Sequence, residues 1–338
     1  MKALVLESAN RFRYEERPMP VCGQEDVLVK VDAVCICGSD VHAIAGRSPL
    51  FTYPRVIGHE VAATVQEVGR HVSGFVSGDR VCLMPCISCG HCHACRKGHT
   101  NCCSSLRLYG VQTDGGLQEY FTAPASNWLK VSNPNQPAQI AMIEPLTIGA
   151  HAVAKLDLEP EDRVLVIGAG PIGVSCALNA KSYGARVTLA DTSSERRIFV
   201  TDCFGFTVMD PLSEDYAEKI ETYSKGELFD AVIDTTANKR SMDTAWRYAA
   251  QAGKILFVGI SGGMLEIDEA KFHMKEPSLY VTRNSTRRDY ERILELCAAG
   301  KMRPADLITH SATFAAAAEQ IVRWVQPGSG VFKGVVLF

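Results

Sequence analysis

The amino-acid sequence predicts an α/β protein of two domains, a β-barrel domain and a domain built on a doubly wound parallel sheet. Its 338 residues suffice for two domains of about 100–200 residues each, and 46% of them are hydrophobic, enough for two buried cores. Short apolar runs separated by Gly, Pro and Ser fill the first part of the chain. Strand-like and helix-like runs alternate from about Gln139.

Four short runs are predicted to be strands of the first domain: Leu4–Leu6, Val27–Val34, Val61–Val68 and Val81–Leu83. Their β-branched residues, with turn residues between the runs, are typical of a barrel. Between Ser88 and Ser104 the chain is instead crowded with Cys, His and Gly and shows no apolar periodicity. This lobe is too polar to form a core of its own and needs an external staple.

The second domain follows from repeated strand–helix units, which specify a parallel sheet. Strands are predicted at Val164–Ile167, Arg186–Ala190, Thr207–Met209, Ala231–Asp234 and Lys254–Gly259, and helices at Pro171–Tyr183, Ser194–Cys203 and Met242–Ala250. Helices at Arg288–Ala299 and Thr313–Val325 then precede a last strand at Val331–Phe338. A terminal apolar strand needs a sheet to pair with, so we expect it to return to the first domain. The predicted domains are 1–145 with 283–338, and 146–282.

Composition limits the classes of partner and the compartment. The formal net charge of −3 argues against nucleic acid, because binding to a phosphate backbone needs an excess of Lys and Arg. Met1–Glu7 lacks the apolar core of a signal peptide, and no run approaches the roughly 18 apolar residues of a membrane span. We predict a cytoplasmic protein that acts on a small molecule, without a nucleic-acid or membrane partner. In that reducing compartment, the 13 cysteines favour metal sites over disulfides.

A glycine-rich segment matches the dinucleotide-binding pattern G-x-G-x-x-G between a predicted strand and a predicted helix. Its glycines permit a tight turn and close approach of a pyrophosphate, which the helix N-terminus attracts. Asp191 ends the next strand, where a carboxylate binds ribose hydroxyls and repels a 2′-phosphate. NAD is therefore predicted over NADP, although the nearby Arg196 and Arg197 leave NADP open. The predicted cofactor contacts in this Rossmann domain are Gly168, Gly170, Pro171, Ile172, Gly173, Asp191 and Arg196.

Four cysteines in the polar lobe at 86–104 have the spacing C-x2-C-x2-C-x7-C. They are Cys89, Cys92, Cys95 and Cys103. Four thiolates this close can complete a tetrahedral zinc shell and leave no open position, which predicts a structural zinc site that staples the lobe. Cys102 is an alternative fourth ligand and Cys86 is a spare thiol; a disulfide or free thiols are the competing interpretation.

A second group of possible ligands consists of Cys37, His59, Glu60 and Glu144. Together these residues supply sulfur, nitrogen and oxygen donors that suit zinc and leave room for an exchangeable water or substrate oxygen. They are scattered along the sequence, so their spacing does not by itself establish that they meet.

The chain resembles the zinc-containing medium-chain dehydrogenase/reductase family over essentially its whole length. The motifs that carry the resemblance are Cys37-Gly38-Ser39-Asp40-Val41-His42, Gly58-His59-Glu60, the four-cysteine lobe, Asp114-Gly115-Gly116, Glu144-Pro145 and Gly168 to Gly173. It looks most similar to the sorbitol, L-threonine 3- and sugar-acid (L-galactonate-like) dehydrogenases, because ethanol-type members have Cys where Glu144 stands. The resemblance implies a GroES-like catalytic domain, a Rossmann domain, and a homodimer or homotetramer joined through strands of the latter.

The resemblance also implies the ligands of a catalytic zinc. Cys37 and His59 would bind the metal, and Glu60 and Glu144 would ligate it directly or through its water. Two zinc ions per chain are therefore predicted, one catalytic and one structural.

Further roles come from the same resemblance. Ser39 and His42 fall where the family relays the substrate proton to solvent, and Asp40 would orient His59. Arg283 begins a segment that the family passes near the nicotinamide, so we expect it to contact the cofactor and influence specificity. Ala43 stands where polyol dehydrogenases commonly have an aromatic residue, a departure that argues against sorbitol itself.

We therefore predict an NAD-dependent zinc dehydrogenase that oxidises a secondary alcohol of a polyol or sugar acid to a ketone, with hydride transfer to nicotinamide C4. L-Threonine 3-dehydrogenase, or another amino-alcohol or diol dehydrogenase, is the alternative, because it would share both zinc sites and the cofactor. Arg47, Arg107 and Arg283 are candidate contacts for a substrate carboxylate, although exposed arginines are common.

Overall fold

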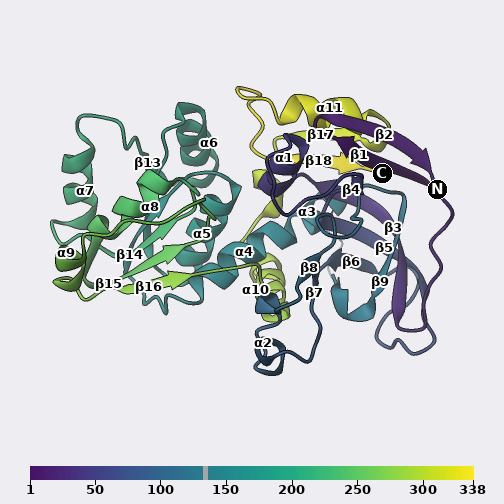
Figure 1. The fold of residues 1–338 in the computed structure, drawn as a ribbon. Coiled ribbons are helices and arrows are strands. Elements are labelled where there is room, and N and C mark those ends of the chain that lie inside the picture. Colours follow the sequence, from purple (N-terminus) through teal and green to yellow (C-terminus); the bar gives the residue numbers. More distant parts are fainter. Residues whose placement is uncertain (132–135) are drawn as a thin grey trace. The chain divides into compact units, whose positions relative to one another are not determined.

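The computed structural model describes residues 1–131 and 136–338, and the chain forms two compact units. The first unit comprises Met1–Pro145 and Thr286–Phe338, and the second comprises Leu146–Ser285. The chain thus leaves the first unit once and returns to it, so both termini belong to that unit (Figure 1). The last strand, β18 (Gly334–Leu337), pairs with β3 (Asp26–Cys35), which confirms the predicted return.

The first unit is a β domain with a seven-stranded and a three-stranded sheet. The large sheet has the order β10-β6-β5-β3-β18-β17, with β9 also paired to β3, and the small sheet has the order β2-β1-β4. The remaining strands are β1 (Lys2–Ser8), β2 (Arg11–Glu16), β4 (Arg55–Val56), β5 (Glu60–Val68), β6 (Arg80–Leu83), β9 (Tyr120–Pro124), β10 (Trp128–Lys130) and β17 (His310–Thr313). All four strands predicted for this domain are present.

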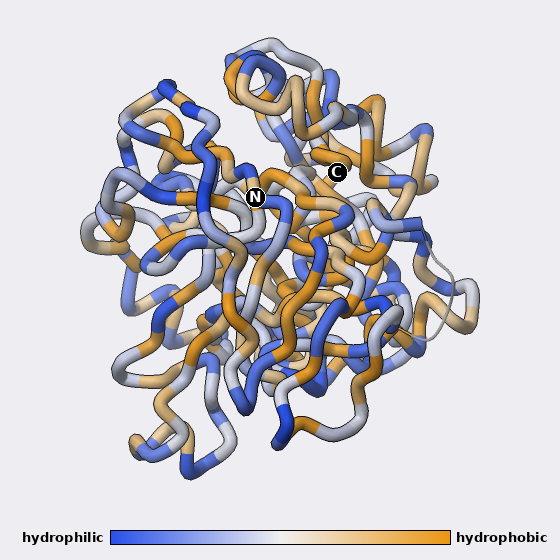
Figure 2. The backbone as a smooth tube through the Cα atoms, turned by 90° about the vertical axis from the view of Figure 1, so that its right-hand side faces the viewer, coloured by the Kyte–Doolittle hydropathy of each residue, from blue (hydrophilic) through white to orange (hydrophobic). Residues whose placement is uncertain are grey.

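The core of this unit lies between its sheets. Apolar side chains of the strands, with Trp128 among them, form one buried cluster. Figure 2 shows hydrophobic and hydrophilic residues alternating along the backbone. Helices and the strand pair of the lobe complete the unit: α1 (Gly38–Ile44), α2 (His93–Arg96), α3 (Pro137–Ala141), α10 (Arg287–Ala298), α11 (Ala317–Trp324), β7 (Cys86–Ile87) and β8 (Arg107–Leu108). Short 3-10 turns lie at Thr100–Cys102, Ala125–Asn127 and Pro304–Leu307.

The second unit is a six-stranded sheet in which all neighbouring strands are parallel. Its order β13-β12-β11-β14-β15-β16 is the 3-2-1-4-5-6 order of a Rossmann fold, as the sequence predicts. The strands are β11 (Arg163–Ile167), β12 (Arg186–Ala190), β13 (Thr207–Met209), β14 (Phe229–Asp234), β15 (Ala249–Phe257) and β16 (Ser278–Val281). Around the sheet (Figure 1) lie α5 (Pro171–Ser182), α6 (Ser194–Phe204), α7 (Tyr216–Ser224), α8 (Lys239–Ala245) and α9 (Glu269–His273). Helix α4 (Ile143–Val153) joins the two units.

The prediction of one helix over Thr313–Val325 is wrong at its start. Thr313 ends β17, a 3-10 turn follows at Phe314–Ala316, and α11 begins at Ala317. Strand β17 pairs in parallel with β18. Thr313 is paired with Leu337 of β18, and this pairing takes the first residue of the predicted helix into the strand, because propensity is a weak determinant beside tertiary pairing.

The prediction of a helix over Met242–Ala250 is wrong at its end. Helix α8 stops at Ala245, and after a 3-10 turn the strand β15 begins at Ala249. Ala249 already pairs with Phe229 of β14, after which the register of the two strands shifts. Ala252 has a φ of 54°, so the strand is irregular here and its apolar pattern is not that of a regular strand.

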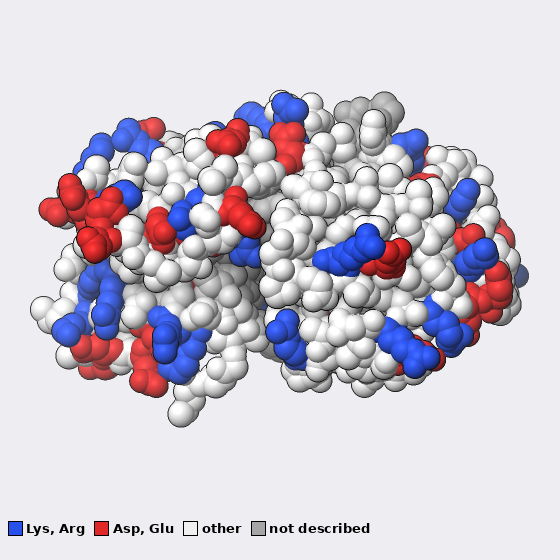
Figure 3. Space-filling view, turned by 90° about the horizontal axis from the view of Figure 1, so that it is seen from above, with Lys and Arg blue, Asp and Glu red and all other residues white. Residues whose placement is uncertain are grey.

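The surface carries both signs of charge. On the face drawn in Figure 3, acidic and basic side chains lie next to one another in several places, with uncharged residues between these groups. Among the described helices, none is long and apolar enough to cross a membrane.

Candidate metal centres and cofactor pocket

Three predicted ligands meet in the first unit. Cys37, His59 and Glu60 each offer one ligand atom, and these atoms all lie within 4.8 Å of one another. Strand pairing explains why residues so distant in sequence converge. Cys35 at the end of β3 is the antiparallel partner of Glu60 at the start of β5, so the segment that follows β3 lies beside the segment that precedes β5. The cluster combines a sulfur, a nitrogen and an oxygen donor, a set that suits zinc.

A glycine turn directs His59 into this cluster. Gly58 has a φ of +96°, and a Cβ there would lie 2.6 Å from Cγ1 of Val34, so only glycine fits. The Asp114-Gly115-Gly116 motif holds the turn in place. The Gly116 N–H donates to the Gly58 carbonyl at 2.8 Å, and the Asp114 carboxylate accepts the Val56 N–H at 3.0 Å.

Asp40 connects the two ligand-bearing segments. One of its oxygens accepts the Cys37 N–H at 2.9 Å at the start of α1, and the other lies 3.7 Å from Nδ1 of His59. Burial opposes a charged imidazole, but Asp40 and the Cys37 thiol outweigh it and raise the pKa of His59 well above its ordinary value. Surroundings that hold a proton this firmly also favour a dication, because metal binding replaces the proton.

One polar atom of the cluster fits a metal ion. Glu60 is fully buried, and its Oε1 accepts from Nζ of Lys333 at 2.6 Å. Its other oxygen, Oε2, is buried without a hydrogen-bond partner among the described residues. Because an unpaired buried carboxylate oxygen is costly, the donor set is consistent with a bound cation.

Glu144 is buried beside the cluster but is not one of the three residues grouped within 4.8 Å. It lies in the first turn of α4. Burial raises the pKa of Glu144 to about 7, with His59 acting in the opposite direction and Glu60 in the same direction. The structure therefore brings the fourth predicted residue into the electrostatic field of His59 and Glu60.

The predicted proton-relay residues lie on α1. Ser39 is exposed, and its Oγ is 3.5 Å from Nε2 of the buried His59. His42 is exposed in the last turn of the same helix. Ser39 thus lies between the buried imidazole and solvent, and His42 lies on the same helix three residues further on.

The four cysteines of the lobe also converge. One sulfur from each of Cys89, Cys92, Cys95 and Cys103 lies within 4.8 Å of the others. Backbone N–H groups point at the sulfurs, with the Cys92 N–H donating to Cys89 at 3.3 Å and the Cys89 N–H to Cys103 at 3.3 Å. The N–H groups of Cys95 and Ser104 lower the pKa of Cys92 to about 5. This favours the thiolate, which is the form that binds metal.

The remaining thiols lie outside that cluster. Cys102 is exposed, so Cys103 and not its neighbour completes the group. All 13 cysteines are free thiols, and no disulfide competes with metal binding.

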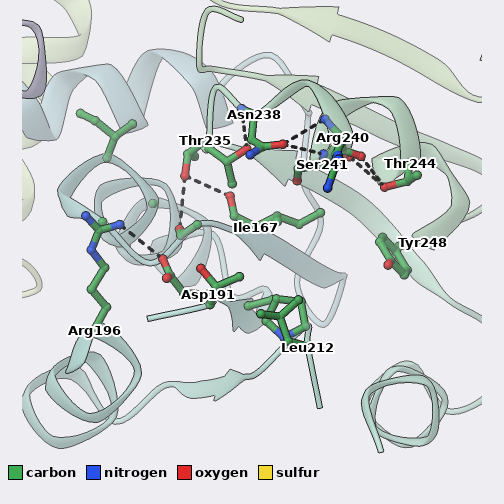
Figure 4. A pocket seen from close by; sticks show the side chains of 18 of the residues that line it. Ile167, Asp191, Arg196, Leu212, Thr235, Asn238, Arg240, Ser241, Thr244 and Tyr248 are labelled. Carbon is green, nitrogen blue, oxygen red and sulfur yellow. Dashed lines mark hydrogen bonds and ion pairs between the residues drawn. The ribbon is translucent and has the colours of Figure 1, made fainter. Parts of the chain in front are cut away.

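A pocket of about 590 Å³ in the second unit includes the glycine loop and Asp191 (Figure 4). Gly173 packs so closely on Gly168 that a Cβ there would lie 1.8 Å from the Gly168 carbonyl oxygen. Asp191 accepts the Ala169 N–H at 2.7 Å and the Ser193 N–H at 2.8 Å. The carboxylate therefore also fixes the loop itself, a role that the sequence pattern does not reveal.

Arg196 contributes a positive charge to the same pocket. Its Nη1 lies 3.6 Å from Oδ2 of Asp191, and Figure 4 shows the guanidinium directed at that carboxylate. The predicted contacts Gly170, Pro171 and Ile172 line the pocket as well. Arg283 is exposed and is not among the lining residues.

Residues after β14 form a wall of the pocket that sequence reasoning missed. They are Thr235, Thr236, Asn238, Arg240, Ser241 and Thr244, with Tyr248 beyond them (Figure 4). Thr235 Oγ1 donates to the Ile167 carbonyl at 3.0 Å, so this wall is tied to the start of the glycine loop. Because β14 is the neighbour of β11 on the side where the strand order reverses, a ligand site is expected there.

Comparisons with known proteins agree with this architecture. Residues 23–133 match the model of the alcohol dehydrogenase GroES-like domain, and residues 171–299 match the model of the zinc-binding dehydrogenase family. L-Galactonate-5-dehydrogenase of Escherichia coli K12 is 36% identical over 338 residues, which is 100% of this chain and 99% of that protein. L-Idonate 5-dehydrogenase of Vitis vinifera is 33% identical over 88% of this chain and 83% of its own length.

A solved structure matches the whole chain. The RspB alcohol dehydrogenase of Escherichia coli CFT073, in complex with NADH, superimposes with a TM-score of 0.93 at 31% identity and covers 100% of this chain and 99% of its own. The chain belongs to the zinc-dependent medium-chain dehydrogenase/reductase family, in its polyol and sugar-acid branch. It is an oxidoreductase.

Proposed function

We propose that the protein is an NAD-dependent zinc dehydrogenase that oxidises a secondary alcohol of a sugar acid or polyol to a ketone. The observation that carries the proposal is the convergence of Cys37, His59 and Glu60 within 4.8 Å. The same chain holds a dinucleotide-type pocket with a carboxylate at Asp191. Metal ligands with S, N and O donors, combined with a nucleotide fold, are what an alcohol dehydrogenase requires.

Zinc would be held by Cys37, His59 and Glu60, with Glu144 beside them, and a second zinc by the four cysteines of the lobe. The first ion supplies Lewis acidity, which favours the loss of a proton from an alcohol at the reaction centre. Ser39 lies 3.5 Å from the imidazole and is exposed, so it can pass that proton on to His42 and solvent. Glu144, whose pKa is about 7, is suited to exchange a proton near neutral pH.

The pocket favours NAD. The Asp191 carboxylate is held by two backbone N–H groups and is 7% exposed, so a 2′-phosphate would meet a fixed negative charge. Nη1 of Arg196 lies 3.6 Å from this carboxylate and partly balances its charge, which reduces the preference for NAD over NADP. When bound, the cofactor accepts hydride at nicotinamide C4.

Sugar acids are the favoured substrates, because two of the similar enzymes are named for L-galactonate and L-idonate. Arg47 and Arg107 are exposed and are candidates to pair with a substrate carboxylate, as is Arg283. L-Threonine lacks the chain of hydroxyl groups that these sugar acids share, and we place it second.

The test is NADH formation with L-galactonate, L-idonate, sorbitol and L-threonine, each also measured with Cys37→Ala protein. We expect kcat/KM to be at least about tenfold higher for a sugar acid than for L-threonine, a difference of roughly 1.4 kcal/mol in barrier. Cys37→Ala should lose the activity. If L-threonine is the best substrate, the alternative activity, L-threonine 3-dehydrogenase, is the correct one. If none of the four compounds yields NADH, the proposal is contradicted.

We also propose that the protein is a homodimer or homotetramer. Strand β16 is the edge of the Rossmann sheet, and its Leu279 and Val281 are 44% and 70% exposed. An edge strand with exposed apolar side chains is suited to pair with another copy. Light scattering should give two or four times the chain mass of 36.8 kDa, and a monomer would contradict this.

A further inference from the structure

The structure contains a buried lysine beside the proposed catalytic centre. Lys333 lies just before β18, and Val335 of β18 is paired with Cys35, which is itself paired with Glu60. The C-terminal segment therefore delivers the lysine to the strand that bears Glu60. Nζ of Lys333 is 2.6 Å from Oε1 of Glu60, and the two side chains are 3% and 0% exposed.

The backbone of Lys333 is fixed on both sides. Its carbonyl accepts the Thr309 N–H at 3.0 Å and the His310 N–H at 3.2 Å, while its own N–H donates to Thr309 Oγ1 at 3.3 Å. The lysine therefore projects from a rigid position, and Glu60 projects from the regular strand β5. Because both backbones are held in place, the distance between the Lys333 ammonium group and the Glu60 carboxylate is fixed by the fold.

The Lys333 ammonium group is paired with the Glu60 carboxylate, and Asp40 and Glu144 are buried in the same unit. A buried charge persists only where it is paired, and here its hydrogen-bonded partner is one oxygen of a proposed metal ligand.

The two oxygens of Glu60 are in different states. Oε1 is held by Lys333, whereas Oε2 has no hydrogen-bond partner among the described residues. A carboxylate can bind a metal through one oxygen or through both. In a catalytic zinc site three protein ligands leave a position for water or substrate, and a carboxylate that bound through both oxygens would add a fifth donor that crowds this position.

We propose that Lys333 is a positioning residue that keeps Oε1 of Glu60 away from the metal, so that Glu60 ligates through Oε2 alone and a coordination position stays open for the substrate. The proposal rests on the proposed function, because it assumes a metal at Cys37, His59 and Glu60. A purely structural ion pair would change stability without changing metal coordination, and this difference makes the role testable.

The test uses the full chain loaded with Co²⁺, whose visible spectrum reports coordination number. Lys333→Met removes the cation, and Lys333→Gln is a second neutral variant that keeps a hydrogen-bond donor. Lys130→Met is the matched control: it removes another lysine–carboxylate pair of the same unit, between Lys130 and Asp79 at 2.7 Å. The contribution of the four-cysteine lobe is removed by subtracting the spectrum of Cys37→Ser protein.

We expect wild-type protein and Lys130→Met to show the intense bands of a four-coordinate site. Lys333→Met should show the weaker bands of a five-coordinate site, because Oε1 then turns to the metal. Its Co²⁺ affinity, measured by chelator competition, should equal or exceed that of wild type, since a nearby positive charge has been removed. Substrate KM should rise by about tenfold or more, which corresponds to roughly 1.4 kcal/mol.

Three results would overturn the proposal: a four-coordinate spectrum with unchanged KM in Lys333→Met, a weakened Co²⁺ affinity in that variant, or a five-coordinate spectrum in wild type. If Lys333→Met does not fold, Lys333→Gln is measured instead. It should show the same changes to a smaller extent, because its neutral amide holds Oε1 more weakly than an ammonium group does. If neither variant folds, the wild-type spectrum decides. Failure of the proposed function looks different. In that case wild-type protein takes up Co²⁺ only at the four-cysteine lobe, and Cys37→Ser changes nothing in the spectrum.

Discussion

The two clusters of candidate metal ligands are built in different ways. In the lobe, Cys89 to Cys103 belong to one short segment, and all four donors are thiols. In the other cluster, Cys37, His59 and Glu60 come from segments that only the pairing of β3 with β5 brings together, and the donors are mixed.

The electrostatic surroundings differ as well. The lobe sulfurs receive backbone N–H groups, as in Cys92 N–H to Cys89. The other cluster is surrounded by buried ionisable side chains, including Asp40, Glu144 and Lys333. A local, all-thiolate shell is closed and stabilises the fold, whereas a shell assembled over long range with mixed donors can leave a position open for chemistry.

The largest effect should come from the mixed-donor cluster. Cys37→Ala should lower kcat/KM by at least about 1000-fold, or roughly 4 kcal/mol, because the metal loses its thiolate ligand. The melting temperature and NAD affinity should stay close to wild type, which thermal denaturation and calorimetric titration measure. Cys22→Ala, at a half-buried thiol of the same unit, is the control and should retain activity. Wild-type turnover in Cys37→Ala would remove this residue from the centre.

The lobe should respond in the opposite way. Cys92→Ser should lower the zinc content by one ion per chain and the melting temperature by about 5 °C or more, the effect of a few kcal/mol in a protein of this size. The exposed Cys102→Ser is the control and should behave as wild type. An unchanged melting curve together with two zinc ions in Cys92→Ser would mean that the lobe does not depend on this ligand.

A smaller effect tests the cofactor pocket. Asp191→Ala should raise KM for NAD by about tenfold and narrow the preference for NAD over NADP, because the charge that opposes a 2′-phosphate is gone. Asp191→Asn keeps an acceptor for the Ala169 N–H and should separate the loss of charge from the loss of loop order. The exposed Asp202→Ala on α6 is the control. If KM for NAD and the preference for NAD over NADP do not change in Asp191→Ala, the cofactor ribose does not contact Asp191.

The smallest effect concerns pH and the metal-free protein. The pKa of Glu144 is raised from an ordinary 4.5 to about 7, so the fold is stabilised by the protonated form. That contribution is complete below about pH 4.5 and is lost as pH rises through 7. As the pH rises from 4.5 to 7, the melting temperature of metal-free wild type should fall relative to that of Glu144→Gln, which cannot ionise. Parallel melting-temperature profiles of the two proteins would show that Glu144 is not perturbed.

The same contrast explains what the sequence could and could not predict. The ligands of the lobe could be predicted from their spacing, because they lie on one segment. The Rossmann domain could be predicted from a local pattern of strand, glycine loop and helix. The grouping of Cys37 with His59 and Glu60 needed the resemblance to a family, because it depends on the register of β3 with β5.

Lys333 belongs to no motif, and its partner Glu60 is 273 positions away, so nothing local predicts their contact. The wall of the pocket after β14 was missed for a similar reason, since it is defined by strand order and not by residue type. At β15, strand pairing overrode the local helix propensity, and at β17 it took in the first residue of a predicted helix.

The most direct test is to follow zinc content, activity and melting temperature together while a chelator is added to the wild-type protein. If the two clusters differ as the structure indicates, one zinc ion per chain should leave first, with complete loss of activity and little change in melting temperature. The second should leave only as the protein unfolds. Simultaneous release of both ions, or loss of the first ion with activity retained, would contradict the division between an open catalytic centre and a closed structural one.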